Sequence, residues 1–186
     1  MTGCPQATGP HVESIMTEPW LSGPVPGIIP DLQPAAHQLL DARADLQRVV
    51  SPLPEPLIWE RPGGAASIGY HLLHAAGSVD RLLTYAAGRP LSDAQYAALD
   101  AEKNPAALGR TGPELLAGIV AAIDRALDVL KHTRADELDM PRGVGRKQLP
   151  SNVRGLLFHV AEHTQRHTGQ VVTTARVLVG LTGQKS

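Results

Sequence analysis

The feature of this 186-residue chain that most limits its possible folds is the helical spacing of apolar residues in four long segments. Leucine, valine, isoleucine and alanine recur at steps of three and four residues over 30–50, 67–87, 111–133 and 151–181, and this spacing gives a helix one buried face. Aromatic residues make up only 3% of the chain, too few for the core of a typical β-sandwich. The sequence therefore predicts an all-α four-helix bundle.

Residues with strong capping preferences mark where these helices begin and end. We expect the first helix to begin at Pro30 or Asp31, and the segments Ser67, Thr111–Glu114 and Ser151 to cap the other three. A short surface helix is predicted at about 92–99. Residues 134–150 are interrupted by proline and glycine and predict a charged loop, with a turn near 143–145 and no strand.

Residues 1–29 have a different composition from the rest of the chain. They contain five prolines among glycines and small polar residues and show no apolar periodicity, which is typical of irregular structure. We predict an irregular Pro/Gly-rich N-terminal arm over 1–29 and a single bundle domain over 30–186. Trp20, Leu21, Ile28 and Ile29 are the residues expected to attach the later part of the arm to the bundle.

Charge and cysteine content exclude several classes of protein. The formal net charge is -1 with neutral histidines, so the chain lacks the basic field that binds nucleic acid or an anionic membrane surface. No apolar run reaches the roughly 18 residues that span a bilayer. The single cysteine, Cys4, excludes a disulfide framework. We therefore expect a cytoplasmic protein.

Histidines carry the clearest functional pattern. Five of the eight lie in two windows, 71–74 and 159–167. Residues four apart share one face of an α-helix, so His159, His163 and His167 form a row in which two neighbouring imidazoles can chelate one ion. A third ligand must come from another element, either His71 or His74. The alternative interpretation is a solvated polar stripe, and we expect the isolated His11, His37 and His132 to be ordinary polar residues.

Two motifs in this sequence resemble those of a known family. The run from Ser67 to His74 (SIGYHLLH), followed late in the chain by His163-x-x-x-His167-Thr-Gly-Gln, is similar to the DinB-like, YfiT-type bundle superfamily. The resemblance covers roughly 31–181 and implies a four-helix bundle that binds a divalent metal through His74, His163 and His167. Thr168 departs from the arginine that often precedes Gly-Gln in the family, which affects a contact around the site and not the ligand set.

An open site of three neutral imidazoles leaves the full charge of the metal to bind and deprotonate a thiol or a water molecule. Relatives in the family include transferases and isomerases that use bacterial thiols such as bacillithiol or mycothiol. The prediction is a metal-dependent thiol S-transferase whose partners are a small-molecule thiol and an electrophilic co-substrate. Zinc or nickel is the expected metal, with iron or manganese as alternatives. His159 is the candidate catalytic proton carrier, and the alternatives are a hydrogen-bonding partner of a ligand or an ordinary polar neighbour.

Two other functions compete with this prediction. The same centre in a hydrolase would activate water against an amide or ester, with His159 as general base; in a non-catalytic stress-response protein it would only bind metal. Arg142, Arg146 and Lys147 are candidates to border the substrate pocket. The family resemblance and the apolar residues Leu178, Val179 and Leu181 suggest a homodimer, although these residues equally suit the core.

Overall fold

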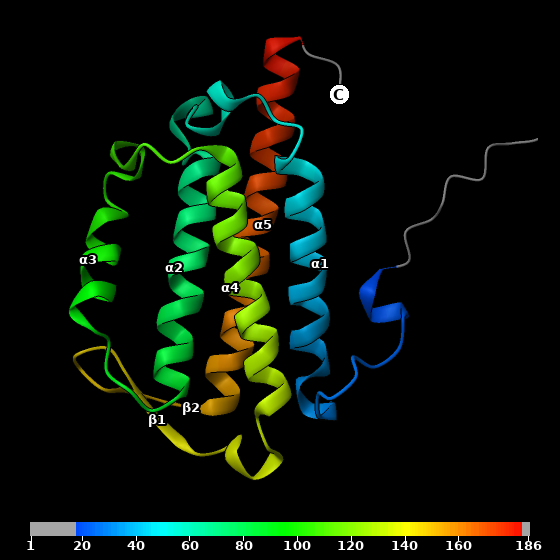
Figure 1. Cartoon of the computed structure of the whole chain (residues 1–186), viewed down its shortest axis with the longest axis vertical. Coiled ribbons are helices and arrows are strands. Elements are labelled where there is room, and N and C mark those ends of the chain that lie inside the picture. Colours follow the sequence, from blue (N-terminus) through cyan, green and yellow to red (C-terminus); the bar gives the residue numbers. More distant parts are fainter. Residues whose placement is uncertain (1–17, 184–186) are drawn as a thin grey trace, which may run out of the picture.

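The computed structural model describes residues 18–183 and shows a bundle of four long helices with a shorter helix along one side (Figure 1). An antiparallel hairpin connects the last two long helices. The helices are α1 (Gln33–Val50), α2 (Ile68–Ala86), α3 (Asp93–Ala101), α4 (Gly112–His132) and α5 (Val153–Thr182), and the strands are β1 (Pro141–Val144) and β2 (Leu149–Asn152). Short 3-10 turns occupy Pro19–Leu21, Pro30–Leu32, Glu55–Ile58, Pro62–Gly64, Pro105–Leu108 and Ala135–Glu137.

The core lies between α1, α2, α4 and α5, with α2 packed against both α5 and α4 and with α1 closing the ring on their other side. Its fully buried side chains are aliphatic: Leu32, Leu39, Leu46, Ile58, Ile68, Leu72, Val79, Ile119, Ile123, Leu130, Leu138 and Leu157. Burial of this apolar surface is the main stabilising contribution to such a bundle. The predicted all-α four-helix bundle is confirmed.

The predicted helix caps are confirmed for two of the long helices. Ser67 Oγ accepts a hydrogen bond from the Tyr70 backbone N–H at 3.1 Å, and Thr111 and Glu114 form the capping box at the start of α4. The cap of α5 is Asn152, whose Oδ1 accepts from the Gly155 N–H at 2.7 Å, so the prediction of Ser151 was wrong. Ser151 pairs with the opposite strand of the hairpin, and the chain therefore turns helical one residue later.

The segment predicted as a charged loop contains a two-stranded sheet instead. Strand β1 pairs with β2 from Pro141 opposite Asn152 to Val144 opposite Leu149. The strands contain proline and glycine and show no apolar alternation, so their sequence does not predict a strand. Proline is tolerated because each strand of a two-stranded sheet is an edge strand. The turn falls after β1, beginning at Gly145 with a φ of 68°, later than predicted.

The described part of the N-terminal arm, 18–29, contains no α-helix, as predicted, while residues 1–17 lie outside the described residues. Ile28 is buried and Ile29 packs against the core. Gln33 holds this segment by hydrogen bonds to the Val25 and Ile28 carbonyls. Trp20 and Leu21 remain 61% and 58% exposed, so the expectation that they attach the arm was wrong.

Within 18–183, no helix has both the length and the apolar character needed to cross a membrane. Of the three residues suggested for a dimer contact, Leu178 belongs to the core and Val179 packs against it, whereas Leu181 is 74% exposed. The short surface helix predicted near 92–99 is α3, capped by Ser92.

Candidate metal centre

Three histidines from two helices, α2 and α5, meet in one cluster. His74 lies in the second turn of α2, and His163 and His167 lie one turn apart on α5. The ring centroids of His163 and His167 are 4.5 Å apart, and those of His74 and His167 are 4.7 Å apart. Each residue offers one ring nitrogen within 4.8 Å of the others, and all three side chains are half-buried. The cluster can therefore hold a metal ion.

The spacing of these nitrogens fits a small divalent cation. His74 Nε2 and His163 Nε2 are 3.2 Å apart. Two nitrogens bound to one tetrahedral zinc by bonds of about 2.0–2.1 Å are separated by about 3.3 Å. The ligand nitrogen of the third ring, His167, lies within 4.8 Å of the other two.

A buried carboxylate, that of Glu102, forms a hydrogen bond with the Nδ1 side of the His74 ring. His74 Nδ1 donates a hydrogen bond to Glu102 Oε2 at 2.6 Å, and Arg81 Nη1 donates to Glu102 Oε1 at 2.6 Å. Burial raises the pKa of the Glu102 carboxyl, but the hydrogen bonds from His74 and Arg81 outweigh this effect and leave the pKa below its usual value. Glu102 is therefore ionised near neutral pH and accepts both hydrogen bonds.

The other histidine of α2, His71, lies next to the cluster but is not part of it. His71 is buried, and its Nδ1 is 2.9 Å from His167 Nδ1, with which it shares a hydrogen bond. This contact leaves Nε2 as the free nitrogen of His167. Of the two α2 histidines, His74 therefore lies with the candidate ligands, and His71 forms a hydrogen bond with His167. Tyr70 stacks on the His74 ring with centroids 5.4 Å apart.

His163 and His167 of the cluster, and His71 beside it, have pKa values lowered by their surroundings. Burial, reinforced by His74 and His159, lowers the pKa of His163 to about 4. Burial and the neighbouring His163 lower the pKa of His167 to about 3. Burial and His74 also lower the pKa of His71. An imidazole must be neutral to bind a metal, so these rings are ready to act as ligands at neutral pH.

These shifts predict how the metal-free protein responds to acid. Histidine in the unfolded chain has a pKa of about 6.5, so between that pH and about 4 the unfolded state binds more protons than the folded state. We expect the free energy of unfolding, measured by urea titration in a chelator, to fall as the pH drops through this window. His167→Asn should flatten the dependence, and equal slopes for the two proteins would contradict the prediction.

His159 occupies the outer end of the histidine row. Its side chain is 48% exposed and its Nδ1 is 3.0 Å from Glu162 Oε2, while its ring centroid is 5.4 Å from that of His163. It lies outside the three-histidine cluster and beside it. Glu162 also pairs with Arg166 on the same helix and is solvent-facing. The isolated His37 and His132 each contact one backbone carbonyl, as expected of ordinary polar side chains, and His11 lies outside the described residues.

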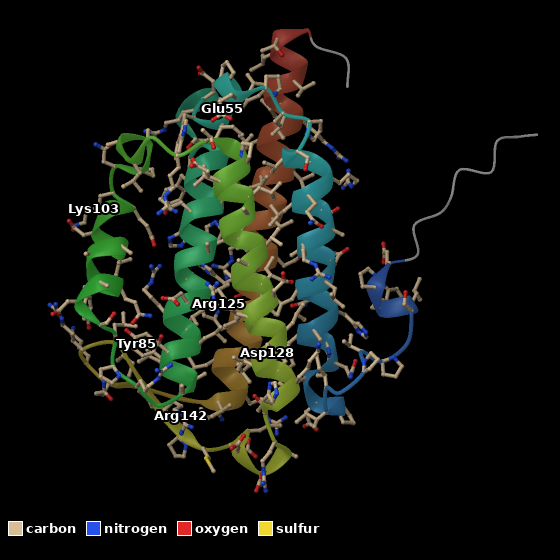
Figure 2. The ribbon with its side chains drawn as sticks, in the orientation of Figure 1. Glu55, Tyr85, Lys103, Arg125, Asp128 and Arg142 are labelled. Atoms are coloured by element: carbon tan, nitrogen blue, oxygen red, sulfur yellow. The ribbon has the colours of Figure 1, made fainter. Side chains whose placement is uncertain are left out.

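Arg142 of the hairpin lies at the end of α2 opposite the turn that carries His74. Arg142 lies at the hairpin end of the bundle, away from Lys103 at the other end of α3 (Figure 2). Its Nε donates to the Ala86 carbonyl at 2.7 Å, so it fastens β1 to the end of α2. Arg146 lies 4.8 Å above the Tyr96 ring. Arg142 therefore does not border the metal centre, which corrects the expectation for this residue.

The sequence did not indicate that Glu102 contacts the histidine cluster. This residue is separated from His74 by 28 positions and ends a short, mostly exposed helix. Nothing in its sequence neighbourhood, Asp100-Ala-Glu-Lys103, distinguishes it from a solvated acidic residue. Only the packing of α3 beside α2 shows that this carboxylate is buried.

The fold and this cluster together define a helical bundle with a candidate three-histidine metal centre. The family model of the DinB superfamily matches residues 38–171, a range that includes all three clustered histidines. The chain therefore belongs to the DinB superfamily, and the family resemblance of its motifs is confirmed. No curated protein matches the chain.

Proposed function

We propose that this protein is a divalent-metal-dependent thiol S-transferase that uses a low-molecular-weight bacterial thiol. The observation that supports this function best is the half-buried cluster of His74, His163 and His167, which offers three imidazole nitrogens and no carboxylate as ligands. Burial lowers the pKa of His163 and of His167, so both rings are neutral near neutral pH. A divalent metal, when bound, stabilises a coordinated thiolate. Neutral ligands leave its charge undiminished, and zinc or nickel suits imidazole donors.

Different residues would bind the metal, exclude water and transfer the proton of the thiol. His74, His163 and His167 hold the centre, and Tyr70 and the buried face of α5 shield one side of it from water. His159 stands at the exposed edge, where it accepts the thiol proton and passes it to solvent. The thiol sulfur then forms a bond to the electrophilic carbon of the co-substrate as the leaving group departs with the bonding electrons. The small-molecule partners are otherwise unspecified.

A metal-dependent hydrolase is the second candidate, because one contact favours it. The Glu162 carboxylate accepts a hydrogen bond from His159 Nδ1 at 3.0 Å, which leaves Nε2 as the basic nitrogen. A histidine oriented in this way by a carboxylate is a suitable general base for water. In this function His159 deprotonates a water molecule, and the substrate is an amide or ester.

One assay separates these functions. The zinc- or nickel-loaded protein is incubated with bacillithiol or mycothiol and monochlorobimane, and free sulfhydryl and fluorescent adduct are measured together. The transferase predicts equal loss of sulfhydryl and gain of adduct, faster than the uncatalysed reaction and lost in His163→Ala. A thiol-independent release of product from amide or ester substrates would support the hydrolase. Absence of turnover with every substrate would favour a metal-binding stress-response protein and contradict the proposal.

The homodimer also remains a proposal. Leu181 is the exposed apolar residue of the three considered, and it lies in the last turn of α5.

A further inference from the structure

Helix α3 is attached to the bundle in an unusual way. None of its nine residues is buried, whereas the residue that ends it, Glu102, is 8% exposed. Near its other end, Gln95 Nε2 donates to Asp80 Oδ2 at 2.6 Å and to Thr84 Oγ1 at 2.8 Å. The contacts that hold α3 beside α2 (Figure 1) are therefore polar ones, and its most deeply placed side chain is a carboxylate.

The placement of this carboxylate is not explained by stability alone. Glu102 pairs with Arg81, which is 9% exposed, and burying two charges costs about as much as their attraction returns. The second oxygen of Glu102 accepts a short hydrogen bond from His74 Nδ1 at 2.6 Å and a longer one from Arg81 Nη2 at 3.5 Å. The arrangement therefore provides a fixed hydrogen-bond acceptor behind a candidate metal ligand, with Arg81 holding that acceptor in place.

Helix α2 makes room for the carboxylate at Gly77, one turn after His74. A Cβ at this position would lie 2.6 Å from Glu102 Oε1 and 2.8 Å from Arg81 Nη1. Glycine inside a helix costs about 1 kcal/mol relative to alanine. The helix thus has an unfavourable residue type, glycine, at the position where a side chain would push the carboxylate away from His74.

We propose that Glu102 is a positioning residue for the metal centre. By accepting the Nδ1 hydrogen of His74, it leaves Nε2 of that ring unprotonated and directed at His163, which is the arrangement a metal ligand requires. Arg81 and Gly77 determine where the carboxylate lies, and α3 carries it there. This inference rests on the metal-centre part of the proposed function and not on the choice of thiol as substrate.

The first measurement is the zinc affinity of the full chain, determined by competition with a chromophoric chelator. Glu102→Ala should weaken binding by about 10–100-fold, the range found when an outer partner of a ligating histidine is removed. Glu102→Gln should fall between this variant and the wild type, because the amide oxygen still accepts from His74. Asp100→Asn is the matched control on the same helix. Its side chain is 72% exposed, and its affinity should equal that of the wild type.

The second measurement needs no metal. Nitrogen NMR of the histidine rings in the metal-free protein should show His74 as a single tautomer protonated at Nδ1, and a mixture of tautomers in Glu102→Ala. This result separates failure of the inference from failure of the metal centre. If the wild type binds no zinc, the His74 tautomer still tests the role of Glu102.

Gly77→Ala keeps the test valid if the Glu102 variants do not fold. The nearest atoms to the added methyl are the far ends of the Glu102 and Arg81 side chains and not backbone, and alanine favours the helix, so the protein should fold while the carboxylate is displaced. We expect weaker zinc binding and a mixed His74 tautomer in this variant too. Wild-type affinity together with a wild-type tautomer in Glu102→Ala, or in Gly77→Ala if the former does not fold, would overturn the inference.

Discussion

Replacing His163 by alanine is expected to remove metal from the protein while leaving its fold in place. The cluster would keep His74 and His167, and two imidazoles bind a divalent ion much more weakly than three. The His163 side chain is only half-buried, so its removal leaves little cavity in the core. Elemental analysis should find near-stoichiometric metal in the wild type and a small fraction of that in the variant.

Thermal melting gives the same prediction a second readout. A ligand that binds only the folded state at 100 times its Kd stabilises it by about 2.7 kcal/mol, so added zinc should raise the Tm of the wild type and not that of His163→Ala. His159→Ala is the matched control, because His159 is also on α5 but lies outside the cluster. It should retain both metal and the Tm increase. Unchanged metal content in His163→Ala would contradict the ligand assignment.

The second large effect concerns the core. Leu39 on α1 is fully buried, and Leu39→Ala should lower the free energy of unfolding by about 2–5 kcal/mol, through lost apolar burial and the cavity left behind. Helix α1 contributes no residue to the histidine cluster, so the folded variant should still bind one metal per chain. Urea unfolding in the presence of a chelator measures the effect.

Leu40→Ala is the control for this substitution. Leu40 is only partly buried against the core, so the same loss of side-chain atoms at the neighbouring position should cost less. Equal effects at the two positions would show that α1 is not oriented as described. Loss of metal in folded Leu39→Ala would show that the centre depends on more than α2, α3 and α5.

The bundle was predictable from sequence because its helices are long and strongly periodic. The regularly spaced apolar residues from Leu115 to Leu130 fit only an amphipathic helix. The caps at Ser67 and Thr111 show where two of the helices begin. The hairpin was not predictable, because its pairing depends on two short segments being brought together by the ends of α4 and α5. Exposure of Trp20 was also missed, since large apolar residues are not always buried.

The site was predictable only in part, for a related reason. The spacing of His163 and His167 places two ligands on one helix face without knowledge of the fold. The choice between His71 and His74 depends on how α2 is rotated against α5, which residue spacing leaves open and family resemblance supplied. The position of Glu102 could not be predicted from the sequence, because its burial follows from the packing of α3 against the bundle and not from its local sequence.

X-ray absorption at the zinc edge of the zinc-loaded protein shows whether His74, His163 and His167 bind one metal ion. We expect three imidazole nitrogens at about 2.0–2.1 Å, the usual zinc–histidine distance, with one further light atom from water or buffer. In His163→Ala any residual zinc should show fewer imidazoles. A wild-type spectrum with fewer than three imidazoles, or a preparation that binds no zinc, would contradict the account.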